Sequence, residues 1–248
     1  MIRHLQIEPP DWMRDERARK LFAVFAAAGA GKIQGYTSED VIAYYLLTML
    51  ARAFSSMPGL ATGIARQVRD GEIKKFLIQP IDLVSYLLLA RIAHKAVYYL
   101  VAAGPFALVY YLCRSYFSGW PAPEVFAAFV LSLVLAFMLG FFLEASMGMI
   151  AFWFLEVTSL LFVYMLFTFF FSGHMFPLDF LPDPWRTIVD FMPFKYMAYF
   201  PAAVFIGKVE GADLVQGLMI QAGWVVFFIL LCRRLMHSGF NRYSGFGG

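Results

Sequence analysis

Charged side chains are scarce in this sequence. They make up 15% of its 248 residues, whereas apolar residues make up 61%. Soluble domains carry roughly 25% charged residues, so the composition is typical of an integral membrane protein. The net charge is only +3, which gives no basis for nucleic-acid binding. We therefore expect an all-α integral membrane protein with about five or six transmembrane helices.

Cysteine and histidine are also sparse, and neither is spaced for a metal site. The two cysteines, Cys113 and Cys232, end apolar runs that we place on opposite faces of the membrane, so we expect no disulfide. The sequence has no glycine-rich phosphate loop of the Walker type and no apparent Ser–His–Asp grouping. We therefore expect no catalytic residues, no metal and no cofactor bound by this chain.

A short polar segment from Arg69 to Ile81 separates two long apolar runs. It is rich in basic side chains, and basic loops stay on the cytoplasmic side of membrane proteins. Gly71 can take the left-handed conformation that ends a helix, and Pro80 prevents easy continuation of the next one. Between them the spacing predicts a short helix with three apolar residues on one face, namely Ile73, Phe76 and Leu77. Such a helix suggests docking on a separate soluble subunit. The alternative is a solvated loop whose apolar face lies on the lipid headgroups.

Residues 1–35 predict an N-terminal amphipathic, interfacial helix and a short or incomplete first span, because the apolar run Leu21–Ala30 is too short to cross alone. The main transmembrane domain is expected over residues 36–248. Apolar runs there predict individual spans at Val41–Ile64, Ala96–Leu112, Val125–Ile150, Phe152–Phe171 and Leu214–Leu231. We place the residues from Asp82 to Lys95 mainly in the interface or cytoplasm.

Prolines punctuate the apolar stretch from Ser172 to Gly207, so no ordinary span fits there. Broken helices that enter the membrane and return are the natural prediction. The basic end of the chain predicts a cytoplasmic C-terminus. We therefore place residues 66–75 and the C-terminus inside, and residues 114–124 and 174–208 outside.

Ionisable side chains within or beside the spans are candidate translocation-pathway residues, namely Arg52, Glu144 and Glu156. An arginine at the centre of a span costs about 2.5–3.5 kcal/mol on insertion scales. We therefore expect Arg52 to line a pathway between subunits, or to pair with Glu144 or Glu156. The alternative is that the span slides and Arg52 snorkels to the headgroups.

Two motifs together resemble the type-2 ABC export permeases, a family of transmembrane subunits. The first matches the cytoplasmic loop of that family and comprises Gly71, Ile73, Phe76, Leu77, Pro80 and Ile81. The second matches its outer re-entrant region and comprises Ser172, Gly173, Pro177, Pro182, Pro193 and Gly207. The resemblance covers about residue 36 to the C-terminus.

The resemblance implies a permease subunit of an ATP-driven exporter in the bacterial cytoplasmic (inner) membrane. ATP and Mg would then bind a partner ABC ATPase, and a second permease copy or a related permease would complete the pathway. The substrate expected is an amphipathic or hydrophobic small molecule or lipid. The coupling helix would comprise Gly71, Glu72, Ile73, Phe76, Leu77 and Pro80, and the outer lid Gly173, Pro177, Pro182 and Pro193.

Two other classes remain open from the residues alone. A secondary transporter would use Arg52, Glu144 and Glu156 for its coupling ion. The sequence shows no clear inverted repeat, which disfavours that class. A membrane-embedded enzyme is the other class, and the scattered histidines disfavour it.

Overall fold

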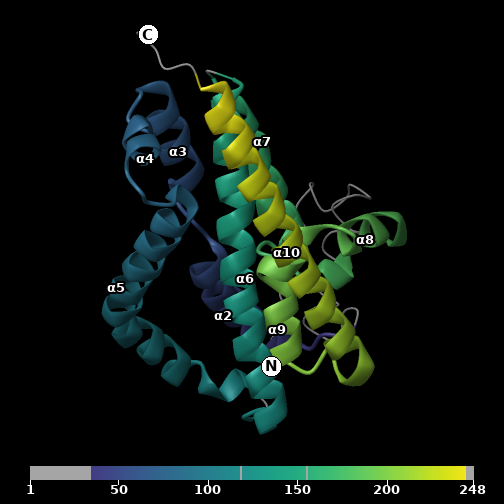
Figure 1. Ribbon diagram of the computed structural model, residues 1–248. Coiled ribbons are helices and arrows are strands. Elements are labelled where there is room, and N and C mark those ends of the chain that lie inside the picture. Colours follow the sequence, from purple (N-terminus) through teal and green to yellow (C-terminus); the bar gives the residue numbers. More distant parts are fainter. Residues whose placement is uncertain (1–34, 118, 155, 244–248) are drawn as a thin grey trace, which may run out of the picture.

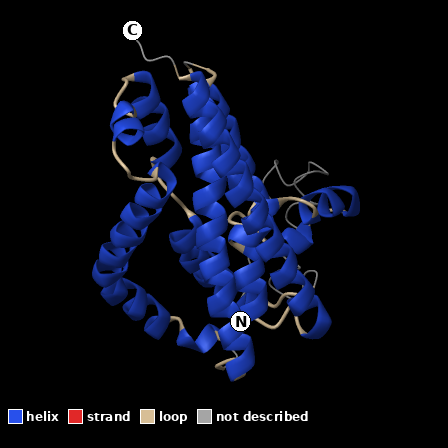
Figure 2. Cartoon of the chain, viewed as in Figure 1, coloured by secondary structure: helices blue, strands red, loops and turns tan. Residues whose placement is uncertain are grey.

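The computed structural model describes residues 35–117, 119–154 and 156–243, apart from the side chain of Leu77. The predicted interfacial helix and incomplete first span lie almost wholly outside these residues. The described part is helical and contains no β-strand (Figure 2). Three of its helices are long and apolar enough to cross a membrane, namely α5 (Leu83–Leu112), Pro123–Phe152 and α10 (Gly211–Arg242). The all-helical membrane fold is confirmed, and the number of spans stays a prediction.

Helix α6 (Pro123–Met149), continued by the turn η3 (Ile150–Phe152), runs through the centre of the molecule. Helix α10 lies along it, and α2, α3 and α9 also pack against it (Figure 1). Its sequence is apolar on nearly every side, as expected for a helix surrounded by others. Buried residues of α6 contribute to both hydrophobic clusters, for example Phe141 in one and Leu133 in the other. The remaining helices are therefore positioned against α6.

The predicted span Val41–Ile64 is broken into two helices, α2 (Ser38–Ser55) and α3 (Leu60–Arg69). Pro58 lies in the break, where it has no N–H to donate and disfavours a helical conformation before it. Gly59 has a φ of 75°, a left-handed conformation that glycine adopts without a steric penalty. The expectation of one continuous span was therefore wrong here.

Helix α5 is a single helix of 30 residues that arcs away from the bundle (Figure 1). Most of its large apolar side chains are exposed, as expected for a helix that faces lipid. Two aromatic contacts tie it to α2: the Tyr110 hydroxyl donates to the Leu46 carbonyl, and Tyr99 stacks on Phe54 with ring centroids 4.6 Å apart. Lys95, which the sequence placed at the interface, is only 8% exposed. It is buried because its ammonium group donates to backbone carbonyls at the end of α2, and its placement at the interface stays a prediction.

Helix α7 (Thr158–Phe171) has 14 residues and so rises about 21 Å. It starts later than the span predicted at Phe152–Phe171, because η3 and a turn come first. The proline-rich region beyond it forms only short helices, as predicted. These are η4 (Leu178–Phe180), α8 (Asp183–Asp190), η5 (Pro193–Met197) and α9 (Tyr199–Phe205). Whether they re-enter a membrane stays a prediction.

Loops that are distant in the sequence meet at the two ends of the molecule. The end of α10 lies near the loop that follows α3, where the Tyr243 hydroxyl is 3.5 Å from the position of a Cβ added to Gly71. Both lie at the top of Figure 1. At the opposite end, Trp120 and Glu210 line one common cavity. The end of α10 and the loop at Gly71 thus lie at one end of the molecule and Trp120 lies at the other, while the side of the membrane that each end faces stays a prediction.

Cysteine labelling tests the sidedness. In a variant without the two native cysteines, we expect a membrane-impermeant thiol reagent on intact cells to label Trp120→Cys and to spare Lys74→Cys. The reason is the basic character of residues 66–75, which holds that loop inside. Labelling at position 74 and protection at position 120 would reverse the topology.

Candidate functional site

The end of α2 is capped by a lysine from another helix. Lys95 of α5 donates from Nζ to the backbone carbonyls of Ala53 and Ser56, the latter at 2.7 Å. The last carbonyls of a helix lack partners within the helix and carry partial negative charge. An ammonium group is therefore a suitable cap for the end of α2, and it satisfies carbonyls that would otherwise be buried without a donor.

A carboxyl group faces the start of α3. Glu144 of α6 lies beside the backbone N–H groups of Met57 and Ala61. The first N–H groups of a helix are unpaired and carry partial positive charge, so an acidic group is favourable there. The break between α2 and α3 is thus held by a cation at its negative end and an anion at its positive end.

Two glycines on α6 let the broken helix approach closely. Gly140, Glu144 and Gly148 are four residues apart and therefore share one face. A Cβ at Gly140 would lie 2.0 Å from the Ser55 carbonyl oxygen, and one at Gly148 would lie 3.0 Å from Ala61 backbone atoms. Small residues at this spacing allow helices in membranes to pack backbone to backbone. Sequence reasoning missed this face, although the spacing of the glycines around Glu144 was visible.

A cavity of about 460 Å³ lies beside the break, between it and α7. Arg52 and Glu144, two of the three predicted pathway residues, both line it, as does His174. The predicted ion pairs of Arg52 do not form, because its guanidinium makes no ion pair or hydrogen bond with any described residue. The structure therefore brings these side chains to one cavity without pairing them.

Glu156, the third predicted pathway residue, lies elsewhere. Its carboxylate is fully exposed and accepts a hydrogen bond of 2.8 Å from the Thr158 N–H at the start of α7. This contact holds the pKa of Glu156 below its ordinary value. Glu156 therefore bonds to the backbone at the start of α7 and does not line the cavity that holds Arg52 and Glu144.

The predicted docking segment forms the short helix α4 (Lys74–Ile78), and Gly71 precedes it with a φ of 77°, as the sequence predicted. Two of the three residues of the predicted docking face, Ile73 and Phe76, are turned inward, however, and the side chain of the third, Leu77, lies outside the described part of the chain. Ile73 is 0% exposed and Phe76 is 7% exposed, and both belong to the hydrophobic cluster beside α6. The Phe76 ring lies 5.3 Å from that of Tyr86. The outward side instead comprises Glu72, Lys74, Lys75, Ile78, Gln79, Pro80 and Ile81.

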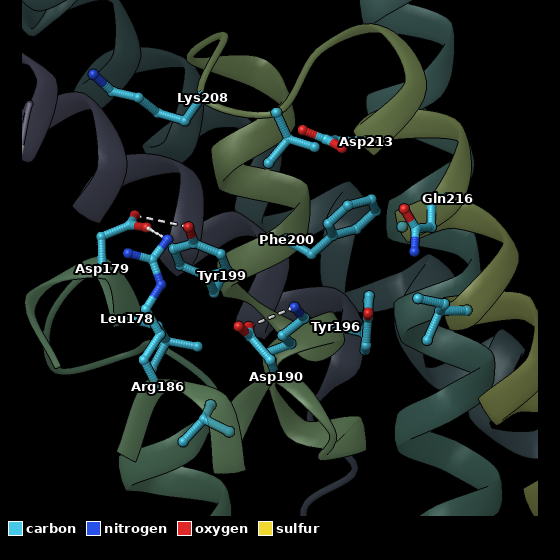
Figure 3. A pocket seen from close by; sticks show the side chains of 15 residues that line it. Leu178, Asp179, Arg186, Asp190, Tyr196, Tyr199, Phe200, Lys208, Asp213 and Gln216 are labelled. Atoms are coloured by element: carbon cyan, nitrogen blue, oxygen red, sulfur yellow. Dashed lines mark hydrogen bonds and ion pairs between the residues drawn. The ribbon is translucent and has the colours of Figure 1, made fainter. Parts of the chain in front are cut away.

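The predicted lid region is held together by Asp179. Its carboxylate accepts hydrogen bonds from the hydroxyls of Tyr36 and Tyr199, both at 2.7 Å, and from Arg186 at 2.9 Å. Figure 3 shows Asp179, Arg186 and Tyr199 of this cluster beside a second cavity of about 460 Å³. Burial raises the pKa of both tyrosines, and the nearby negative charge of Asp179 adds to this, so both hydroxyls remain donors. Three separate segments are thereby joined at one carboxylate.

The other predicted lid residues shape the backbone. Gly173 follows α7 with a φ of 85°, and a Cβ there would lie 2.6 Å from the Tyr44 hydroxyl oxygen. Pro177 and Pro182 precede η4 and α8, and Pro193 begins η5. A proline at the first position of a helix loses no hydrogen bond, because that N–H has no partner in the helix. These residues therefore define where the short helices start.

Comparison with known proteins agrees with this architecture. The family model described as "ABC-2 family transporter protein" matches residues 19–247, which is most of the chain. No curated protein and no solved structure matches it. The long apolar helices are those of a multi-pass membrane protein. The chain belongs to the ABC-2 family of transporter membrane proteins.

Proposed function

We propose that this chain is the permease subunit of an ATP-driven ABC exporter in the bacterial inner membrane. The observation that carries the proposal is the family match over residues 19–247. ATP and Mg²⁺ would bind a separate ATPase subunit. The substrate proposed is an amphipathic or hydrophobic molecule, because the cavity beside the α2–α3 break is lined mainly by apolar groups.

The structure changes which residues we propose for the ATPase contact. Ile78 is 83% exposed at the end of α4, and Ile81 follows it on the exposed loop. Lys74 and Lys75 flank this apolar patch on the same exposed segment. Burying Ile78 in a groove of the partner would contribute roughly 1.5–3 kcal/mol, whereas an exposed ion pair contributes about 0–1 kcal/mol. Phe76 supports the contact from inside by anchoring α4 to the core.

The proposed contact is connected to the candidate site through a short path. Helix α3 has 10 residues and joins the α4 loop directly to the α2–α3 break. Closure of two ATPase subunits would move α4, and α3 would transmit that movement to the cavity.

The exposed apolar surfaces of α5 and α7 could contact lipid or a second permease copy. The Asp179 cluster would act as the outer lid.

Paired substitutions in α4 separate docking from folding. We expect Ile78→Asp to leave the chain folded and to abolish copurification of the ATPase, because it places a charge in the proposed contact. Phe76→Ala should instead lower the stability of the chain, by about 3–5 kcal/mol for a buried phenylalanine. Detergent-extracted chain is assayed for its melting midpoint and for bound ATPase.

Lys74→Ala serves as the matched control on the same helix, and it should change neither quantity appreciably. Full ATPase binding by Ile78→Asp, together with loss of binding in Lys74→Ala, would show that the contact is electrostatic and would refute the apolar contact.

A further inference from the structure

The cavity beside the α2–α3 break has an uneven distribution of charge. Arg52 is the only arginine or lysine among the described residues that line it. Its guanidinium has no ion-pair partner among those residues. The one acidic residue at the cavity, Glu144, already faces the N–H groups at the start of α3 and the positive charges of Arg91 and Lys95. The unneutralised charge in this cavity is therefore positive.

One ring nitrogen of His174, at the same end of the cavity, also lacks a partner among the described residues. His174 lines the cavity near Arg52, and its Nδ1 contacts the Ser172 hydroxyl. Its Nε2 is buried and has no hydrogen-bond partner among the residues that the structure describes. When the Ser172 hydroxyl donates to Nδ1, Nε2 carries the hydrogen and is itself a donor. A buried donor without an acceptor is unfavourable, and an anionic group beside Arg52 would supply that acceptor.

The rest of the cavity is an apolar wall along α7. Its lining runs from Thr158 to Phe169, a rise of about 16 Å, and includes Leu161, Phe162 and Met165. The Arg52–His174 end lies at the C-terminal end of α7, because His174 follows that helix closely. The cavity volume of about 460 Å³ falls within the range of small-molecule sites. The cationic end of the cavity is thus continued by a wall along α7 that is mainly apolar.

We propose that this cavity binds an anionic amphiphile, with its acid group on Arg52 and its apolar tail along Leu161 and Met165 of α7. The proposal rests on the proposed transport function, since it names the class of molecule carried. The shared chemistry is an acid group on an apolar chain, whether that molecule is a membrane lipid or a soluble amphiphile.

Equilibrium binding to the purified full chain tests the proposal without any ATPase. The probe is radiolabelled dodecanoate, measured with the chain in phosphatidylcholine nanodiscs, and compared with dodecanol and dodecylamine of the same chain length. We expect dodecanoate to bind most tightly. Arg52→Gln should weaken it about tenfold, as expected for the loss of a charged hydrogen-bond partner, whereas Arg52→Lys should retain most of the affinity.

Two further variants make the result specific. Met165→Trp should weaken both dodecanoate and dodecanol, because it fills the apolar wall. Arg66→Gln, which removes an exposed arginine from α3 outside the cavity lining, should change nothing. Competition by phosphatidylglycerol would identify a lipid as occupant, and its absence would identify a soluble amphiphile. Both outcomes support the site.

Unchanged dodecanoate affinity in Arg52→Gln, or tighter binding of dodecylamine than of dodecanoate by the wild type, would overturn the proposal. Because the assay contains no ATP, a failure here leaves the ATPase contact at Ile78 untouched. A failure of ATP-driven function would likewise leave this binding result standing.

Discussion

Replacing Gly140 with alanine is expected to destabilise the chain severely. The new Cβ would lie 2.0 Å from the carbonyl oxygen of Ser55 and 2.9 Å from its carbonyl carbon. These are backbone atoms at the end of α2, so no side chain can rotate out of the way. Overpacking commonly lowers stability by about 1–3 kcal/mol, and we expect a clash with backbone atoms to lower it by about 3 kcal/mol or more. The measurement is the melting midpoint and yield of monodisperse chain after detergent extraction.

Gly104→Ala and Gly223→Ala are the matched controls for this prediction. Both glycines lie inside long helices, and a Cβ at either would meet no atom within 4 Å. Alanine favours the helix over glycine by roughly 0.5–1 kcal/mol, so these two variants should be as stable as the wild type or slightly more so. A Gly140→Ala variant that melts with the controls would show that α2 does not pack against α6 in this way.

Removing the charged caps of the α2–α3 break gives the second large effect. Lys95→Met leaves the Ala53 and Ser56 carbonyls without their lysine donor. Glu144→Leu removes the carboxyl group that faces the N–H groups of Met57 and Ala61. Each unsatisfied group costs about 1–3 kcal/mol, and more where no water can reach it. We expect both variants to melt lower than the wild type and to lose transport.

The double variant shows whether the two caps act on one structure. Both side chains hold the same break. The double variant, Lys95→Met with Glu144→Leu, should therefore lose less stability than the sum of the losses in the two single variants. Arg234→Met is the control, because it removes an exposed positive charge on α10 that makes no contact with the break among the described residues. Single variants with wild-type melting midpoints would mean that the break needs neither cap.

Local sequence patterns predicted those parts of the fold that depend on local chemistry. The apolar runs at Val125–Ile150 and Leu214–Leu231 became α6 and α10, each extended at its ends. The left-handed conformation of Gly71 followed from its place between two helical segments. The prolines between Ser172 and Gly207 limited that region to short helices, as their missing N–H groups require.

The errors came from features that depend on distant neighbours. Pro58 was visible within the predicted span, but a break there is stable only because Lys95 and Glu144 arrive from α5 and α6. Phe76 had the spacing of an exposed docking face, yet it packs beneath α4 against Tyr86. Periodicity shows that residues share a face of a helix. It does not show whether that face meets the same chain or a partner.

The candidate site was predicted in part for the same reason. The cost of an intramembrane charge singled out Arg52 and Glu144 correctly as side chains that need special surroundings. The same argument included Glu156, because the sequence did not show that α7 begins only at Thr158. His174 and Lys95 were passed over as interfacial residues, since their partners are backbone and side-chain groups of other segments.

ATP hydrolysis by the assembled transporter tests the central claim most directly. The chain is placed in nanodiscs with the ATPase subunit that copurifies with it, and the steady-state rate is compared with that of the ATPase alone. We predict that the wild-type chain raises the rate, that Ile78→Asp abolishes the increase, and that Lys74→Ala preserves it. A rate that the wild-type chain leaves unchanged, or an increase that survives Ile78→Asp, would contradict the account.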